Sequence, residues 1–243
     1  MSRYEAGKRD GLARIGIYEE GETSVSLPAA LDTDGLFPAL RERSLSNVPL
    51  SAEEAFVRDY FSPGEGQPVT VHPLAAQTAE SGDCTMVAGW HTALKNPRNY
   101  ATWLATLKES VPPDTAWYAP ASALPSTACL LVYSGFDLFD YRAVDLASAQ
   151  KTFCLPEGEF PASLMETGAC GCEGCRDGDL VRHNRLALDR ELALVRHFIE
   201  AGRLRELMES RCRVDAEQVG ILRFLDRNYA LMERSLPVAR AVP

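Results

Sequence analysis

Three cysteines within six positions constrain this chain more than any other feature of its sequence. Cys170, Cys172 and Cys175 form a CxCxxC pattern in a glycine-rich segment. Zn²⁺ in a structural role prefers a closed tetrahedral shell of thiolate and imidazole ligands, so one more ligand is expected. His183 lies eight residues after Cys175 at the start of a predicted helix. His197 lies fourteen residues further along that helix, roughly 20 Å away at the α-helical rise. The pattern predicts zinc bound by the three cysteines and His183; the alternative is three free thiols.

The remaining composition is that of a globular protein. Of the 243 residues 46% are hydrophobic and 24% charged, which is ordinary for one domain, or one domain with a small appendage. The odd total of seven cysteines argues against a disulfide framework. We expect the other four to be buried apolar fillers: Cys84, Cys129, Cys154 and Cys212. Neither a membrane-length apolar run nor a signal-peptide core is found in the sequence, so we expect a cytoplasmic protein with no membrane association.

Charge is distributed unevenly along the chain. Residues 176–243 hold 13 Arg and 11 acidic residues, a net charge of +2, whereas residues 1–175 hold 12 basic and 23 acidic residues, a net charge of −11. A nucleic-acid partner binds through Lys and Arg. If RNA is bound, the sequence therefore predicts contacts on the C-terminal helices, by arginines that include Arg182, Arg185, Arg203, Arg205, Arg211 and Arg213.

Strand and helix patterns alternate in the first two thirds of the chain. Residues 13–31 read as two strands around the turn at Gly21, and Ser51 is placed to begin a helix over 51–61. A second helix is predicted over 96–111, with Asn96 as N-cap and Pro97 at its first position. Further β-rich runs are predicted over 68–74, 84–91, 115–122 and 128–139. The alternation indicates βαβ units and a parallel sheet with functional groups at the carboxyl ends of its strands.

The last third is predicted to be helical. From Leu180 onward an apolar face is expected to comprise Val181, Leu188, Leu192, Val195 and Ile199, with Gly202 ending the helix and two further helices following. We therefore predict an α/β part over residues 1–165 and a zinc-binding helical subdomain over 166–243.

Several motifs together resemble the tRNA-guanine transglycosylase family. These are the CxCxxC followed by a helix that begins with His183 and Asn184, the stretch GFDLFDYRAVDLASAQKTFCLPEG, and KRDGLARIG near the N-terminus. The closest likeness is to the archaeosine synthase branch, whose members act on 7-cyano-7-deazaguanine already placed in tRNA. The resemblance implies a TIM-type (β/α) barrel, but only about 160 residues precede the zinc motif, fewer than the ~200 of a compact barrel. We therefore expect a reduced or incomplete barrel.

Family chemistry implies two carboxylates. By resemblance Asp140, the second Asp of GFDLFD, is the nucleophile that forms a covalent ribosyl enzyme, although an Asp here is equally suited to cap the helix that follows. Asp137 is predicted to contribute to substrate binding, or to be a hydrogen-bonded residue at the strand end. The family's second aspartate lies in an Asp-Ser-Gly motif, which this sequence lacks. His72 and His91 follow predicted strands and are candidates to line the substrate pocket, although structural histidines are more common.

The resemblance leaves three functions open. The one favoured is a subunit or domain for archaeosine formation in tRNA that requires a second chain with the catalytic core and a PUA RNA-binding domain. The alternatives are an active transglycosylase that exchanges a base through Asp140, and a non-enzymatic zinc-stabilised interaction scaffold. The expected cofactor is Zn²⁺ and the expected partners are tRNA and the second chain, with a dimer left open.

Overall fold

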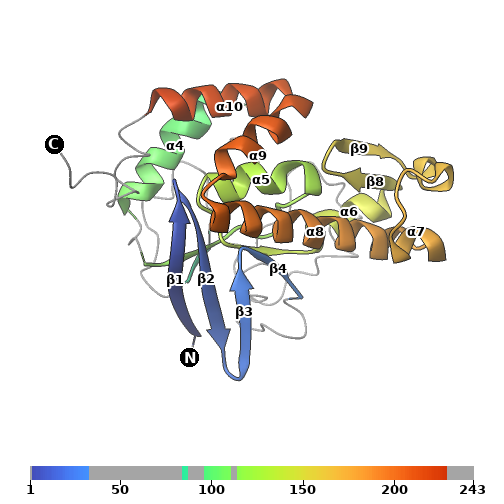
Figure 1. Ribbon diagram of the computed structural model, residues 1–243, viewed down its shortest axis with the longest axis horizontal. Helices are drawn as coiled ribbons and strands as arrows, with labels where there is room; N and C mark the ends of the chain where they lie inside the picture. Colours follow the sequence, from blue (N-terminus) through green and yellow to red (C-terminus); the bar gives the residue numbers. More distant parts are fainter. Residues whose placement is uncertain (1, 33–83, 87–95, 111–113, 229–243) are drawn as a thin grey trace, which may run out of the picture.

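The structure is a computed structural model in which residues 2–32, 84–86, 96–110 and 114–228 are described (Figure 1). Nine strands are described: β1 (Ser2–Asp10), β2 (Ala13–Glu20), β3 (Thr23–Leu27), β4 (Ala29–Leu31), β5 (Cys84–Met86), β6 (Ala116–Tyr118), β7 (Leu138–Asp140), β8 (Thr152–Leu155) and β9 (Gly158–Pro161). The described α-helices are α4 (Pro97–Ser110), α5 (Pro125–Tyr133), α6 (Arg142–Ala149), α7 (Glu173–Asp177), α8 (Leu180–Ala201), α9 (Leu204–Arg211) and α10 (Ala216–Arg227). Two 3₁₀ segments, η2 (Ala162–Thr167) and η3 (Cys212–Val214), join them.

The strands form three sheets. An antiparallel sheet has the order β1-β2-β3, and its β2–β3 turn contains Gly21 at φ +64°, a conformation that glycine adopts without steric cost. A second sheet has the order β4-β7-β6-β5, and all its pairings are parallel. Strands β8 and β9 form a separate antiparallel hairpin. The parallel sheet positions Asp140, because this residue ends β7 and lies opposite Leu31 at the end of β4.

Helices α5 and α8 form the centre of the packing. Every residue of α5 except Thr127 is buried, because α5 contacts β2, α8, α9 and the β8–β9 hairpin. Helix α8 runs along the molecule from the zinc motif to the antiparallel sheet (Figure 1). One hydrophobic core includes Leu12, Trp117, Leu188 and Ile221, so it extends across both the α/β part and the C-terminal helices. A smaller core lies between the antiparallel and parallel sheets.

Several predicted elements are confirmed. The turn at Gly21, the helix beginning at Pro97, the strand at 116–118 and the three C-terminal helices all occur. Asn96 caps α4 by accepting a hydrogen bond from the backbone N–H of Asn99. The α/β class is also confirmed, whereas a closed barrel is not formed by the residues that the structure describes.

Two predictions were wrong. The run 128–139 was predicted to be β-rich, but its first half belongs to α5, and only its end enters β7. Helix and strand cannot be distinguished by periodicity when a segment is buried on all sides. Val181 was assigned to the apolar face of α8, yet it is 44% exposed, while the other four residues of that face are buried. The predicted helix over 51–61 and the strand over 68–74 lie outside the described residues.

None of the helices in the described part of the chain has the length and apolar character needed to cross a membrane.

Candidate metal centre

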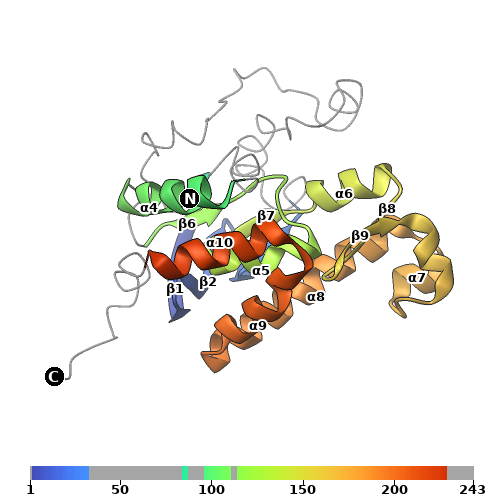
Figure 2. The ribbon, with the colours of Figure 1, turned by 90° about the horizontal axis from the view of Figure 1, so that it is seen from above.

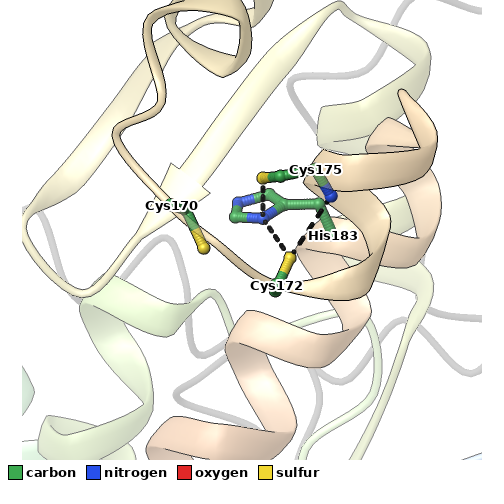
Figure 3. A group of neighbouring side chains, drawn as sticks. All are labelled: Cys170, Cys172, Cys175 and His183. Atoms are coloured by element: carbon green, nitrogen blue, oxygen red, sulfur yellow. Dashed lines mark hydrogen bonds between the residues drawn. The ribbon is translucent and has the colours of Figure 1, made fainter.

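The four predicted ligands lie together at the start of α8 (Figure 3). Their donor atoms all lie within 4.8 Å of one another. Nδ1 of His183 is 3.3 Å from Sγ of Cys172 and 3.2 Å from Sγ of Cys175. Cys170 approaches from the chain that precedes α7. Tetrahedral zinc with Zn–S near 2.3 Å and Zn–N near 2.0 Å places its ligand atoms about 3.5–3.8 Å apart, so this group fits the shell with small adjustments.

The protonation chemistry of the donors also fits a cation. Partial burial and the neighbouring thiols of Cys172 and Cys170 raise the pKa of Cys175 to about 12, because a thiolate here would face other sulfurs. Burial lowers the pKa of His183, which favours the neutral imidazole that metals bind. A divalent cation at the centre would remove the penalty for ionising the thiols.

The outer face of the imidazole is fixed by the β8–β9 hairpin. Nε2 of His183 lies 3.1 Å from the backbone carbonyl oxygen of Cys154, which can only accept a hydrogen bond. Nε2 must therefore carry the proton, and the lone pair of Nδ1 is directed toward the sulfurs. Phe153 stacks on the ring, with centroids 3.9 Å apart.

Asn184 anchors the same hairpin to α8 and α6. Its Oδ1 accepts a hydrogen bond from the backbone N–H of Cys154 at 2.8 Å, and its Nδ2 donates to Ser148 Oγ and the Thr152 carbonyl, each at 2.8 Å. The His-Asn pair thus supplies one candidate ligand, His183, and one residue, Asn184, that fixes the hairpin against which the His183 ring lies. The sequence interpretation assigned no role to Asn184, although its position beside His183 in the family-like motif was visible.

Gly174 permits the close contact between α7 and α8. A Cβ atom at this residue would lie 2.4 Å from the backbone nitrogen of His183 and 2.9 Å from the carbonyl oxygen of Asp179, so no other residue fits without movement of one helix. Asp179 caps α8 by accepting a hydrogen bond from the backbone N–H of Arg182. The glycine was also missed from the sequence, because tertiary contact rather than local conformation requires it.

Asp140 is held by hydrogen bonds on both oxygens. Oδ1 accepts from the backbone N–H groups of Ala121 and Arg142, at 3.0 and 3.1 Å. Oδ2 accepts from the hydroxyl of Tyr118 at 2.7 Å and from the guanidinium of Arg142 at 3.1 Å. The residue is 1% exposed, and burial raises its pKa, opposed by Arg142 and Tyr118. These bonds secure the loop after β6, where Ala121 has a φ of +50°. Asp140 therefore braces this loop through both carboxylate oxygens in the described structure.

Asp137 forms a buried ion pair. Arg14 donates from Nε and Nη2 to its two oxygens at 2.9 and 2.7 Å, and the backbone N–H of Trp117 donates at 2.8 Å. The two charged side chains are 3% and 1% exposed. This geometry links β2, β6 and β7, which is the structural alternative considered for Asp137. His72 and His91 lie outside the described residues.

The arginines expected to contact RNA are largely paired with carboxylates. Arg185 binds Asp145 through two hydrogen bonds, and Arg211 binds Glu191 in the same manner. Arg182, Arg203 and Arg205 also form ion pairs within the chain. Of the six named in the sequence interpretation, Arg213 alone has no ion pair among the described residues, and it donates to the Glu209 carbonyl. The face predicted for RNA is therefore mostly neutralised.

Comparison with known proteins places these features in a family. No protein-family model matches the sequence. Archaeosine synthase subunit alpha of Methanosarcina acetivorans is 34% identical over 84% of this chain and 34% of its own length. Archaeosine synthase of Haloferax volcanii is 30% identical over 98% of this chain and 45% of its own length. The chain belongs to the tRNA-guanine transglycosylase family. A tRNA-guanine(15) transglycosylase of Methanosarcina mazei is 25% identical over 56% of this chain and 31% of its own length.

Within this family the archaeosine synthases match the larger share of the chain, as the GFDLFD stretch and the cysteine motif predicted. The chain spans about a third to just under half of the length of these relatives. The cysteine and histidine cluster and the His-Asn start of α8 were among the residues that suggested this family, and the comparisons agree with them.

Proposed function

We propose that this chain is a transglycosylase-like subunit or domain that acts in the formation of archaeosine in tRNA, together with a second chain carrying the catalytic core and a PUA domain. The observation that carries this proposal is the pattern of coverage. Nearly the whole chain matches archaeosine synthases, yet it accounts for only 34% and 45% of their lengths. We propose that the catalytic core and the PUA domain correspond to the part of these relatives that the match does not cover.

The state of Asp140 supports a role without base exchange by this chain alone. A nucleophile must present a carboxylate oxygen to the anomeric carbon at about 3–3.5 Å. Both oxygens of Asp140 are occupied by hydrogen bonds and the residue is 1% exposed. The active transglycosylase is kept as the alternative, because Asp140 lies at the carboxyl end of a parallel strand, the position that barrel enzymes use for catalysis.

Zinc is proposed to be the metal of the Cys170, Cys172, Cys175 and His183 group. It would tie the chain before α7 to the start of α8, with no part in group transfer. For the fold, we propose an incomplete (β/α) barrel of which β4, β7, β6 and β5 form one arc. The division between residues 1–165 and 166–243 is proposed as one of sequence organisation, since the hydrophobic core extends across it.

Nucleoside mass spectrometry of tRNA from cells lacking the gene tests this function. We expect archaeosine to disappear and 7-cyano-7-deazaguanine to accumulate in tRNA, because base insertion would proceed without this chain. Loss of both bases would instead support the active transglycosylase, and normal archaeosine would reject the proposed role. Returning the gene with Asp140→Asn separates the proposed role from the active transglycosylase further. If Asp140 is the nucleophile, the amide cannot replace it and archaeosine stays absent. If Asp140 only braces the loop after β6, a folded Asp140→Asn protein restores archaeosine.

A further inference from the structure

The exposed arginines of the described structure differ in whether they have carboxylate partners. On α8 and α9, five of the arginines predicted to contact RNA are paired, as described above. On α4 and α10, Arg98, Arg223 and Arg227 are exposed, and none of them forms an ion pair among the described residues. Arg227 lies over the ring of Phe224, 5.6 Å from its centroid. Because carboxylates already bound to Arg must be displaced before phosphate can bind, unpaired arginines are the better phosphate ligands.

The three arginines lie on two helices that pack against each other. Helices α4 and α10 pack against each other, and they lie side by side in both views (Figures 1 and 2). The two helices come close together at Gly220, where a Cβ atom would lie 2.7 Å from the Pro97 ring. Arg98 follows Pro97 directly, while Arg223 and Arg227 lie three and seven residues after Gly220, on the same side of α10. We call this set the α4/α10 arginine surface.

The neighbouring exposed side chains suit a polyanion. On α4 they are Asn99, Thr102, Thr106 and Glu109, so the described exposed face of that helix carries one acidic residue, at its far end. On α10 Asp226 is paired with Arg205, which leaves Glu217 at the beginning of the helix. A local excess of positive charge on a chain with a net charge of −9 is the arrangement expected where phosphates are bound.

We infer that the α4/α10 arginine surface binds the phosphate backbone of tRNA, through Arg98, Arg223 and Arg227. This inference rests on the proposed function and identifies the face that meets the RNA. Backbone contacts of this kind position the RNA without reading its sequence. They allow a second chain to contribute base recognition.

The test measures binding of an unmodified tRNA transcript to the full chain by fluorescence anisotropy across a salt series. The variant Arg98→Gln/Arg223→Gln/Arg227→Gln is compared with Arg190→Gln/Arg203→Gln/Arg213→Gln, which removes the same charge from exposed positions of α8 and its neighbours. We expect the first variant to lose at least about tenfold in affinity and its salt slope to fall by about 2–3, roughly 0.7–0.9 for each of the three contacts removed. The control should retain the wild-type slope, and circular dichroism establishes that both variants are folded.

Each outcome decides a different claim. If wild-type protein binds tRNA and the first variant binds with unchanged affinity and slope, the surface assignment is wrong while the proposed function stands. If both variants weaken equally, binding follows net charge and the assignment is also wrong. If the wild-type chain does not bind tRNA at any salt concentration, this chain does not contact the RNA and the inference fails, whereas the nucleoside analysis still tests the function.

Discussion

Replacement of Asp140 by asparagine distinguishes a brace from a nucleophile by stability alone. The substitution keeps the shape, and one amide oxygen still accepts from the backbone N–H groups of Ala121 and Arg142. The NH₂ group then faces the guanidinium of Arg142, and the Tyr118 hydroxyl loses the charged oxygen to which it donates its hydrogen bond. Hydrogen bonds to a charged group contribute about 1.5–3 kcal/mol each, and two are changed.

Two effects reduce this cost. Asparagine removes the carboxylate charge, whose burial is unfavourable and raises the pKa of Asp140, and its neighbours can adjust. The Arg142 side chain is 12% exposed and keeps some access to water, and Tyr118 can turn its hydroxyl to accept from the amide. We therefore expect Asp140→Asn to lower the free energy of unfolding by about 2–4 kcal/mol, more than the ~1 kcal/mol of a lost helix cap. Urea unfolding followed by circular dichroism measures this quantity.

Asp145→Asn is the matched control. Asp145 also binds an arginine through two hydrogen bonds, but its side chain is 26% exposed and that of Arg185 is 41% exposed, so the expected cost is below about 1 kcal/mol. Residues kept for chemistry often reduce stability, and their replacement is then neutral or stabilising. An Asp140→Asn protein as stable as wild type, with its fold retained, would refute the brace and favour the nucleophile.

Three further predictions concern the metal centre and a partly buried lysine. Protein purified without chelator should contain one equivalent of zinc by elemental analysis, and Cys172→Ser should lower it to less than half an equivalent; substoichiometric zinc in the wild type would exclude a structural site. Gly174→Ala should reduce zinc affinity at least about tenfold in competition with a chelator, because the added Cβ would force α7 away from His183. Gly171→Ala is the control: its Cβ meets no atom within 4 Å, so its zinc affinity should equal that of the wild type. Burial, aided by Arg14, lowers the pKa of Lys108 to about 7, so between pH 7 and 10.5 the unfolded chain holds a proton on this lysine that the folded chain does not. The free energy of unfolding should therefore rise with pH over that range. If the stability of the wild type relative to Lys108→Met does not increase from pH 7 to 10, this prediction is wrong.

The fold was predictable where local chemistry determines it. Asn96 and Pro97 indicated the start of α4, Gly21 the β2–β3 turn and Gly202 the end of α8, because caps and turns are specified by neighbouring residues. Helix α5 was mistaken for a strand because its burial on all sides erased the periodicity that identifies a helix. The barrel was expected from resemblance, and among the described residues the parallel strands form an open sheet of four.

The metal ligands were predictable because their residue types and close spacing are themselves local features of the sequence. The residues that hold the ligands in place were not predictable. Sulfur and imidazole donors at close spacing have little other purpose, so Cys170, Cys172 and Cys175 indicated a site without any structure. Asn184 and Gly174 act on residues that belong to other elements, and their roles follow from contacts that the sequence does not encode locally.

This difference changes what loss of the metal should do. The sequence alone indicates no covalent or metal tie other than the zinc motif between the C-terminal helices and the α/β part, which by itself predicts that these helices unfold first when a ligand is removed. In the structure, Leu188, Leu192 and Val195 of α8 lie in the same core as Trp117 and the residues of α5. Zinc would instead join α7 and the chain before it to the first turn of α8. The other described polar links between α7 and α8 include the exposed ion pairs of Arg182 with Glu173 and Asp177, which contribute little. Chelation should therefore increase amide hydrogen exchange in residues 162–179 first and leave the centre of α8 protected, since local stability follows local apolar burial. Exchange that rises equally throughout α8 would show that the metal holds the whole helix, contrary to the continuous core described above.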